Sequence, residues 1–378
     1  MPKDFDVATD ATPEEIKSLF RSCRLIGRRF RLAHVRFGRE IVEVATFRGA
    51  ASDEDDDADH ESVNGRIVRD NVYGTLEQDA WRRDFSVNCL YYNIADFSVV
   101  DYTTGMEDLK NRTLRLIGEP ETRYREDPVR TLRALRFAAK LDFKIDSASE
   151  GPLTRAAEEL AAIPPARLFE EVLKLFMEGS ALKTYRLLQR YGVFEMLFPE
   201  THACLEDDEA LVANRLVEKA LENTDVRIAE GKPVTPAFLF AALLWEPMRQ
   251  DVEANIARGM STAQGYDLAA ADVIEREVEH VAFPKRFSLV AREIWGMQPR
   301  LERERGERAK QLLGRGRFRA AYDFLVLRAQ AGEPVDDAAK WWTKFQEVGE
   351  DEQNAMLEKP KRGRKRRRRR RSRKGAVQ

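Results

Sequence analysis

The spacing of apolar residues changes along the chain from a strand period to a helix period. Up to about residue 118, apolar positions recur at every second residue in short runs, and 41–48 is the clearest of these. From about residue 150 they recur every three to four residues, as on amphipathic helices. The pattern predicts an α+β fold: a small mixed sheet with helices, followed by an all-helical remainder.

Helix start signals support this division. Thr12, Pro13 and Glu15 form a capping-box pattern, and Asp127-Pro128 and 163–167 each place a proline where a helix begins. Asp127 is predicted as a helix N-cap. Beyond these starts, helices are predicted over 181–198, 208–222, 236–248, 264–280, 287–296 and 317–330.

The strand with the most chemical interest lies near the start of the chain. Asp4 and Asp6 are two residues apart, so both side chains lie on one face of a strand, with Phe5 and Val7 on the other. Paired carboxylates suit Mg²⁺, which takes one or two of them together with substrate phosphates. The pair alone is a weak signal, because solvated carboxylates at this spacing are common.

Glu43 lies inside the 41–48 strand, where an acid is costly unless it is paired or bound to a metal. Two interpretations follow. Glu43 is a possible third acid beside the metal-binding pair, or it forms an ion pair with a nearby arginine.

The segment around Asp84 also allows two interpretations. In one, Asp84 contacts a metal or a ribose while Arg83 contacts phosphate; Asn88 shares a face with Asp84 if the segment is helical. In the other, Asp84 is the N-cap of a helix entrance with solvated arginines, and on this segment alone that interpretation is favoured.

A further cluster of charge follows Asp127. Arg130, Arg133 and Arg136 recur at helical spacing and form a cationic stripe beside an apolar face. Guanidinium groups in such a row suit triphosphate or RNA phosphates. The alternative is a solvated helix face with Asp127 as a cap, and we favour the binding role because Glu126 and the arginines converge at one helix end.

The net charge of −1 conceals a segregation of charge. Twelve of the residues 361–374 are Lys or Arg and none is acidic, so the rest of the chain carries −13. Such a tail cannot bury apolar surface and is predicted to be disordered, binding RNA through electrostatic attraction. The RNA-binding residues we select in it are Arg362, Arg364, Lys365, Arg366 and Arg367.

Other features of composition exclude several classes of protein. The three cysteines have no paired spacing, which argues against a disulfide framework and a zinc site. No signal peptide or long apolar run is found, so membrane insertion is not expected and a cytoplasmic location is predicted. The tryptophans at 245, 295, 341 and 342 are predicted to be core or interface residues.

Taken together, these motifs resemble the class II nucleotidyltransferases, the family of tRNA nucleotidyltransferases and poly(A) polymerases. The block 27–35 and the basic tail resemble the poly(A) polymerase branch of the family. The resemblance covers nearly the whole chain, and its motifs are residues 2–9, 27–35, 43–48, 82–88, 101–109, 126–130, 163–170 and 318–323.

The resemblance implies a palm-like head, a helical neck and body, and template-independent addition of AMP from ATP to RNA 3′ ends. It implies that Asp4 and Asp6 bind the metal, Mg²⁺ or Mn²⁺, with Asp84 as the third catalytic acid. It further implies nucleotide-binding roles for Arg83, Asn88, Asp127, Arg130 and Arg133. Expected partners are RNA 3′ ends, ATP and RNA-decay machinery.

One departure from the family pattern concerns the first residues. The family places a strand and a Gly-Gly-x-Val-Arg-Asp turn before the carboxylate strand, and this chain begins at Met1-Pro2. We expect that segment to be encoded upstream of Met1, because its backbone N–H groups would cradle the triphosphate. Two alternatives to poly(A) addition stay open: CCA addition to tRNA, and RNA binding without full catalysis.

The predicted domain boundaries follow from these patterns. The nucleotidyltransferase head covers 1–118, a helical neck that binds nucleotide and RNA covers 119–200, a helical body covers 201–350, and the basic tail covers 351–378.

Overall fold

The computed structural model describes residues 6–27, 31–49, 60–63, 66–70, 72–303 and 308–357. The chain forms two compact units, residues 1–292 and 293–378. Asp4, the acidic loop after Gly49 and the basic tail, including its five selected RNA-binding residues, lie outside the described residues.

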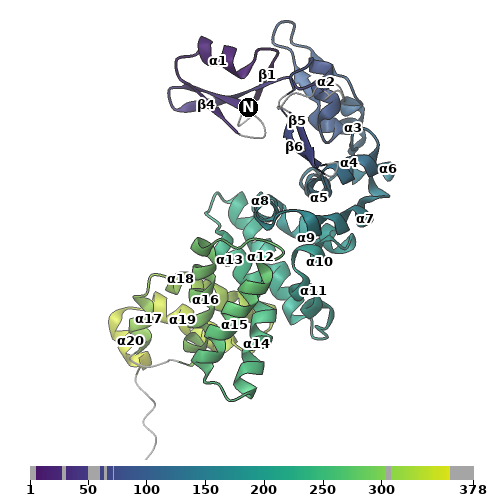
Figure 1. The fold of residues 1–378 in the computed structure, drawn as a ribbon. Helices are drawn as coiled ribbons and strands as arrows, with labels where there is room; N and C mark the ends of the chain where they lie inside the picture. The colour runs from purple at the N-terminus through teal and green to yellow at the C-terminus, as the bar shows by residue number, and fades with distance from the viewer. Residues whose placement is uncertain are drawn as a thin grey trace, which may run out of the picture. The chain divides into compact units, whose positions relative to one another are not determined.

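A four-stranded mixed sheet opens the first unit (Figure 1). Its strand order is β1-β4-β3-β2, with β1 parallel to β4 and the other neighbours antiparallel. The strands are β1 (Asp6–Thr9), β2 (Cys23–Ile26), β3 (Leu32–Phe37) and β4 (Glu40–Thr46). Helix α1 (Pro13–Leu19) packs Ile16 against Ala33, Val35 and Val44, which covers one face of the sheet.

Local signals predicted these elements well. Thr12 caps α1, and the reciprocal bonds between Thr12 and Glu15 form the predicted capping box. Gly27 follows the end of β2 with a φ of 87°, a left-handed conformation that glycine adopts without a steric penalty.

Among the described residues, the other strands of the first unit belong to short elements. Two antiparallel hairpins are present, and a two-stranded parallel pair joins β9 to β10. The strands are β5 (His60–Val63), β6 (Arg66–Asp70), β7 (Leu90–Tyr92), β8 (Val99–Asp101), β9 (Thr113–Leu114) and β10 (Lys144–Ile145). The helices are α2 (Leu76–Arg82), the 3₁₀ turn η1 (Ser86–Asn88) and α3 (Gly105–Asn111).

The structure differs from the predicted helix entrance at Asp84. Helix α2 ends at Arg82, and the chain passes through η1 into strand β7. Two aromatic residues in β7, Tyr91 and Tyr92, favour a strand and pair with Val100 and Val99. The parallel β9–β10 pair also places a strand beyond residue 118, where only helices were predicted.

Helices make up the rest of the first unit, as the apolar period predicts. They are α4 (Pro120–Glu126), α5 (Val129–Leu141), α6 (Ser147–Glu150), α7 (Leu153–Ala157), η2 (Glu158–Ala162), α8 (Pro165–Phe176), α9 (Ala181–Arg190), α10 (Val193–Leu197), α11 (Pro199–Glu206), α12 (Val212–Ala229), α13 (Pro236–Leu243), α14 (Trp245–Ala257) and α15 (Thr262–Glu277). Their core contains a chain of aromatic rings in contact, with Phe198 against Phe194 and Phe240. Helix α16 (Lys285–Arg303) runs from the first unit into the second.

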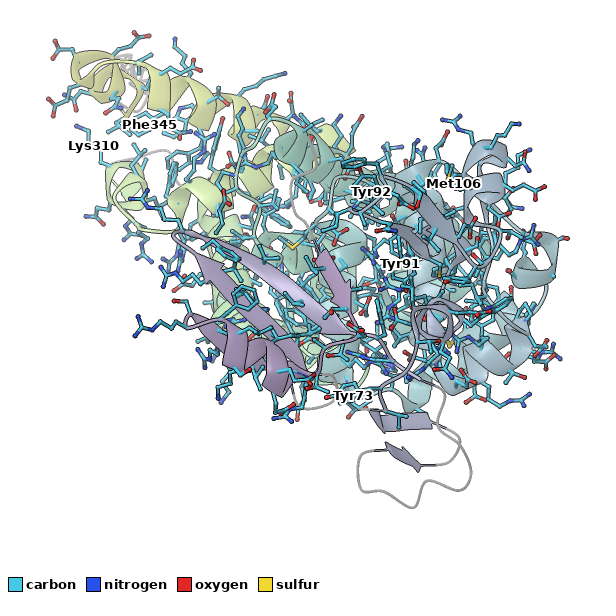
Figure 2. The ribbon with its side chains drawn as sticks, turned by 90° about the horizontal axis from the view of Figure 1, so that it is seen from above. Tyr73, Tyr91, Tyr92, Met106, Lys310 and Phe345 are labelled. Atoms are coloured by element: carbon cyan, nitrogen blue, oxygen red, sulfur yellow. The ribbon has the colours of Figure 1, made fainter. Side chains whose placement is uncertain are left out.

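The second unit packs α17 (Arg308–Leu313), α18 (Phe318–Ala331), α19 (Asp336–Glu347) and α20 (Glu350–Leu357) with the end of α16. Trp342 is fully buried and donates its indole N–H to the Leu301 carbonyl at 2.8 Å. Trp341 stacks on Phe345, which is labelled in Figure 2. The prediction that the tryptophans are core or interface residues is confirmed in the core for Trp245, Trp295 and Trp342, while the partly buried Trp341 packs against the same cluster as Trp342.

None of the helices in the described part of the chain combines the length and apolar character that crossing a membrane requires.

Candidate active site

A row of polar side chains crosses the face of the sheet opposite α1. The register places Asp6 beside Glu43, Glu43 opposite His34, and His34 opposite Arg24, so the row spans all four strands. Residues paired in register point to the same face, with their Cα atoms about 5 Å apart. The face that α1 leaves open therefore carries two carboxylates side by side, an imidazole and a guanidinium.

Glu43 lies against a histidine, whereas one of its two interpretations paired it with an arginine. The Nε2 atom of His34 lies 3.0 Å from Glu43 Oε1, although it is not aligned for a hydrogen bond. No arginine pairs with Glu43 among the described residues, which exclude 28–30. Glu43 is half exposed, so its carboxylate is accessible to a ligand from solvent.

The donor set on this face fits a hard divalent cation, because carboxylate oxygens are the ligands that Mg²⁺ prefers. Asp6 and Glu43 supply two such groups. Within the described ranges, no group of three His, Cys, Asp or Glu side chains is placed to hold an ion. A third carboxylate would have to come from elsewhere, and Asp4 is two residues from Asp6 in the sequence.

Asp84 is held by two arginines from α5. Its Oδ1 accepts from Arg130 Nε at 2.8 Å and its Oδ2 accepts from Arg133 Nη1 at 2.6 Å. Burial raises the pKa of Asp84, but the two adjacent guanidinium groups outweigh burial and leave its pKa below the usual value. Asp84 is therefore an anion whose two oxygens both have cationic partners.

The same segment is anchored to the helices that follow the sheet. Arg123 on α4 donates its Nη2 to the carbonyls of Arg82 and Arg83 at 2.8 and 2.9 Å. Arg130 is buried, and its Nη1 donates to Glu126 at 3.0 Å. The cationic stripe predicted on α5 is thus neutralised on one side by acids, which hold the guanidinium groups in fixed positions.

Asp127 is buried at the junction of α4 and α5, with 8% of its surface exposed. It ends α4, and its side chain does not cap α5, whose N-cap residue is Pro128. Its Oδ2 accepts from Arg167 Nη2 on α8 at 2.7 Å, whereas Oδ1 is buried without a hydrogen-bond partner among the described residues. An unpaired buried carboxylate oxygen is costly, and it is an available acceptor.

Arg83 is positioned by a carboxylate and a phenol. Its Nε and Nη2 donate to Asp79 Oδ2 at 3.3 and 3.2 Å, and Nε lies 2.9 Å from Tyr91 Oη. Tyr91, labelled in Figure 2, donates its hydroxyl to the same Asp79 oxygen. Asp79 Oδ1 accepts from the Arg48 amide at 3.2 Å, which ties this cluster to the end of β4.

The structure therefore brings the predicted nucleotide-binding residues into two groups. Arg130 and Arg133 each contact Asp84, while Arg83 belongs to the Asp79 cluster. The exposed Asn88 joins the second group only through its carbonyl, which accepts from Arg83 Nη1 at 3.4 Å. Both groups belong to the first unit.

The sequence interpretation gave no role to Asp79, Tyr91, Arg123 or Arg167. A signal existed for Asp79, because it precedes Arg83 by four residues and this spacing forms helical ion pairs. No local signal could assign Arg167 to Asp127, because the two are 40 residues apart in the sequence.

Comparison with known proteins identifies the family. Residues 1–115 match the "Poly A polymerase head domain", 142–205 the "Probable RNA and SrmB- binding site of polymerase A", and 258–375 the "Polymerase A arginine-rich C-terminus". The chain is 48% identical to poly(A) polymerase I of Escherichia coli O6:H1 over 362 residues, which is 94% of this chain and 78% of that protein.

CCA-adding enzymes are more distant. That of Staphylococcus epidermidis is 31% identical over 195 residues, covering 51% of this chain and 46% of that enzyme. A solved tRNA-processing enzyme with CTP aligns with a TM-score of 0.60 at 20% identity, covering 92% of this chain and 85% of that one, which shows a shared fold. This chain belongs to the bacterial poly(A) polymerase family of nucleotidyltransferases, because 94% of it aligns with poly(A) polymerase I and three segments match family models of that polymerase.

Proposed function

We propose that this chain transfers AMP from ATP to the 3′ ends of RNA without a template. Membership of the poly(A) polymerase family supports the reaction class. The observation that carries the proposal is the register of β1 and β4, which sets Asp6 beside Glu43 on the open face of the sheet. A nucleotidyl transfer needs such a concentration of carboxylates to hold cations against the triphosphate.

Asp4, Asp6 and Glu43 are the residues that would hold Mg²⁺ or Mn²⁺. A divalent ion bound there supplies Lewis acidity, which favours ionisation of the RNA 3′-hydroxyl and neutralises charge on the triphosphate. His34 lies beside Glu43, with 3.0 Å between Nε2 and Oε1.

Asp84 has a different role in this proposal. Family resemblance suggests it as a third catalytic acid, yet both of its oxygens are engaged by Arg130 and Arg133. We propose that Asp84 is a positioning residue that fixes these two guanidinium groups at the nucleotide site. Arg83, held by Asp79 and Tyr91, is proposed to contact the triphosphate.

Base selection is proposed to rest on Asp127, with Arg130 and Arg133 beside it. Its buried Oδ1 lacks a partner in the described part of the chain and can only accept hydrogen bonds. The exocyclic amino group of adenine donates, whereas guanine and uracil present carbonyl oxygens at the corresponding edge. Asp127 would therefore accept ATP and exclude GTP and UTP.

CCA addition is the second candidate, and the same observation keeps it in consideration. Cytosine also carries an exocyclic amino group, so the acceptor at Asp127 Oδ1 suits CTP as well as ATP. The sequence identity to the CCA-adding relative is lower and covers less of the chain than the identity to poly(A) polymerase I, which favours the poly(A) reaction.

Extension of a labelled RNA with one nucleotide at a time tests the proposal. Purified chain with Mg²⁺ should produce long tails with ATP alone. A short extension that requires CTP would support the CCA-adding alternative instead. RNA binding without extension by any nucleotide would show an RNA-binding protein with an impaired site. Asp6→Asn is the control that should abolish tailing while RNA binding persists.

The family resemblance extends the proposal to the cellular setting. We propose that the chain acts in the cytoplasm on RNA destined for decay, together with RNA-decay enzymes. Recovery of such enzymes with the tagged full-length chain from ribonuclease-treated extracts would support this, and their absence would count against it.

A further inference from the structure

The second unit contains a pocket that the proposed reaction does not use. It has a volume of about 610 Å³, within the range of ligand-binding pockets. It lies between the end of α16 and the loop that precedes α18, elements that Figure 1 labels. Its lining residues are Glu293, Gly296, Met297, Arg300, Arg315, Gly316 and Arg317.

The charge of the lining favours an anion. Three of the seven lining residues are arginines and one is an acid. That acid, Glu293, is engaged by Arg317, with 3.0 Å between Oε2 and Nε. Arg300 and Arg315 are exposed and have no acidic partner among residues 293–303 and 308–357, the part of this unit that the structure describes.

Two glycines leave the pocket open to a bulky ligand. A Cβ atom added at Gly296 or at Gly316 would meet no atom within 4 Å. Gly296 lies inside helix α16, where glycine is less favourable than alanine. Because an added Cβ would meet no atom there, no steric conflict requires glycine at this position. The backbone of the helix is therefore accessible from the pocket.

The lining also indicates which part of a nucleic acid would enter. Guanidinium groups bind phosphate oxygens through paired hydrogen bonds. None of the described residues that line the pocket is aromatic, so they offer no surface on which a base could stack. Recognition would be limited to phosphates and therefore indifferent to RNA sequence.

We propose that this pocket binds phosphate groups in the backbone of the RNA substrate, with Arg300 and Arg315 as the main contacts. The proposal deepens the proposed function, on which it rests for the identity of the anion. A second RNA contact, separate from the site that holds the 3′ end, would retain the RNA between successive additions of AMP.

The first test removes the charges of Arg300 and Arg315. The double variant Arg300→Gln/Arg315→Gln should weaken binding of a long oligouridylate about tenfold. The slope of the logarithm of the binding constant against the logarithm of the salt concentration should become shallower by roughly 1.4, because each of two single-strand phosphate contacts contributes about 0.7. The matched control is Lys340→Gln/Lys344→Gln, which removes the same charge from exposed positions on α19 that already pair with Asp336 and Glu352. The control should stay within about twofold of wild type.

The second test fills the pocket without changing its charge. Gly296→Leu places a side chain in open space, so the thermal midpoint should not fall, yet binding of the oligouridylate should weaken severalfold. The KM for ATP, measured with a short primer, should not change in either pocket variant.

Three results would overturn the proposal. The first is wild-type RNA affinity and salt slope in both pocket variants, and the second is an equal loss in the lysine control. The third is a raised KM for ATP with unchanged RNA binding, which would show a nucleotide pocket instead. Failure of the proposed function is a separate result, because it appears as an inability of wild-type protein to extend RNA.

Discussion

Asp84 and Arg130 form an ion pair between the segment that follows α2 and the buried face of α5, with 2.8 Å between Oδ1 and Nε. The two residues are 46 positions apart in the sequence. Arg133 completes the arrangement by binding the second oxygen of Asp84. The proposed nucleotide site therefore depends on a contact between the sheet-containing region and the helices that follow it.

Replacing Asp84 with asparagine should destabilise the protein and impair catalysis together. The change removes the carboxylate that both guanidinium groups share, although Arg130 keeps Glu126 and Arg133 keeps Glu171 as acidic partners. Breaking a buried ion pair costs on the order of 3 kcal/mol. Urea unfolding should show this loss, and the KM for ATP should rise. A double-mutant cycle with Arg133→Gln should reveal a coupling free energy of roughly 1–3 kcal/mol. Additive effects would show that the pair does not act as a unit.

The same ion pair predicts a pH dependence of stability. The pKa of Asp84 in the folded protein lies below its usual value because the attraction of Arg130 and Arg133 exceeds the effect of burial. Its contribution is complete above the unfolded pKa of about 3.9 and is lost as the pH falls through the folded value. The difference in unfolding free energy between wild type and Asp84→Asn should therefore shrink on acidification below about pH 4. A difference that grows there would contradict this assignment.

Glu43→Gln should reduce kcat by about 10²-fold with little effect on stability, since the side chain is half exposed and is proposed to hold the cation. Glu40→Gln is the matched control, because Glu40 is an exposed acid on the same strand but on the opposite face. Single-turnover tailing at several Mg²⁺ concentrations distinguishes them. Equal rates for the two variants would remove Glu43 from the proposed metal site.

Asp127→Asn should change which nucleotide is used. The amide oxygen is expected to replace Oδ2 as the acceptor for Arg167, which leaves the NH₂ group facing the nucleotide in place of Oδ1. A donor there disfavours adenine and cytosine and favours bases with a carbonyl, so the preference for ATP over UTP or GTP should fall by roughly 10- to 100-fold. Undiminished preference for ATP would show that base selection lies elsewhere.

Asp79→Asn should weaken triphosphate binding through Arg83. The carboxylate orients Arg83 and also accepts from the Tyr91 hydroxyl, so its loss releases the guanidinium. We expect a higher KM for ATP and a smaller change in kcat. Tyr91→Phe keeps the Asp79–Arg83 ion pair and should retain most of the affinity. A loss in Tyr91→Phe as large as that in Asp79→Asn would indicate general disruption of the cluster.

Features set by neighbouring residues were predictable from the sequence. The cap at Thr12 and the start of α8 at Pro165 depend on residues within one helical turn, and the structure confirms both. The partners of Asp84 and Asp127 were not predictable, because they are 40 or more residues away in the sequence. The segment after Asp84 was misjudged because its short apolar run fits a helix and a strand equally, and pairing of β7 with β8 decides between them.

The basic tail gives the last prediction, from sequence alone. Residues 361–374 carry twelve cations, and each phosphate they neutralise adds about 0.7 to the salt slope of single-strand binding. Deleting residues 360–378 should therefore weaken RNA binding at low salt and make the slope shallower, while the KM for ATP with a short primer stays the same. A scrambled tail of identical composition should restore both properties, because the attraction depends on charge rather than on order. An unchanged slope after deletion would assign RNA capture to residues 1–359.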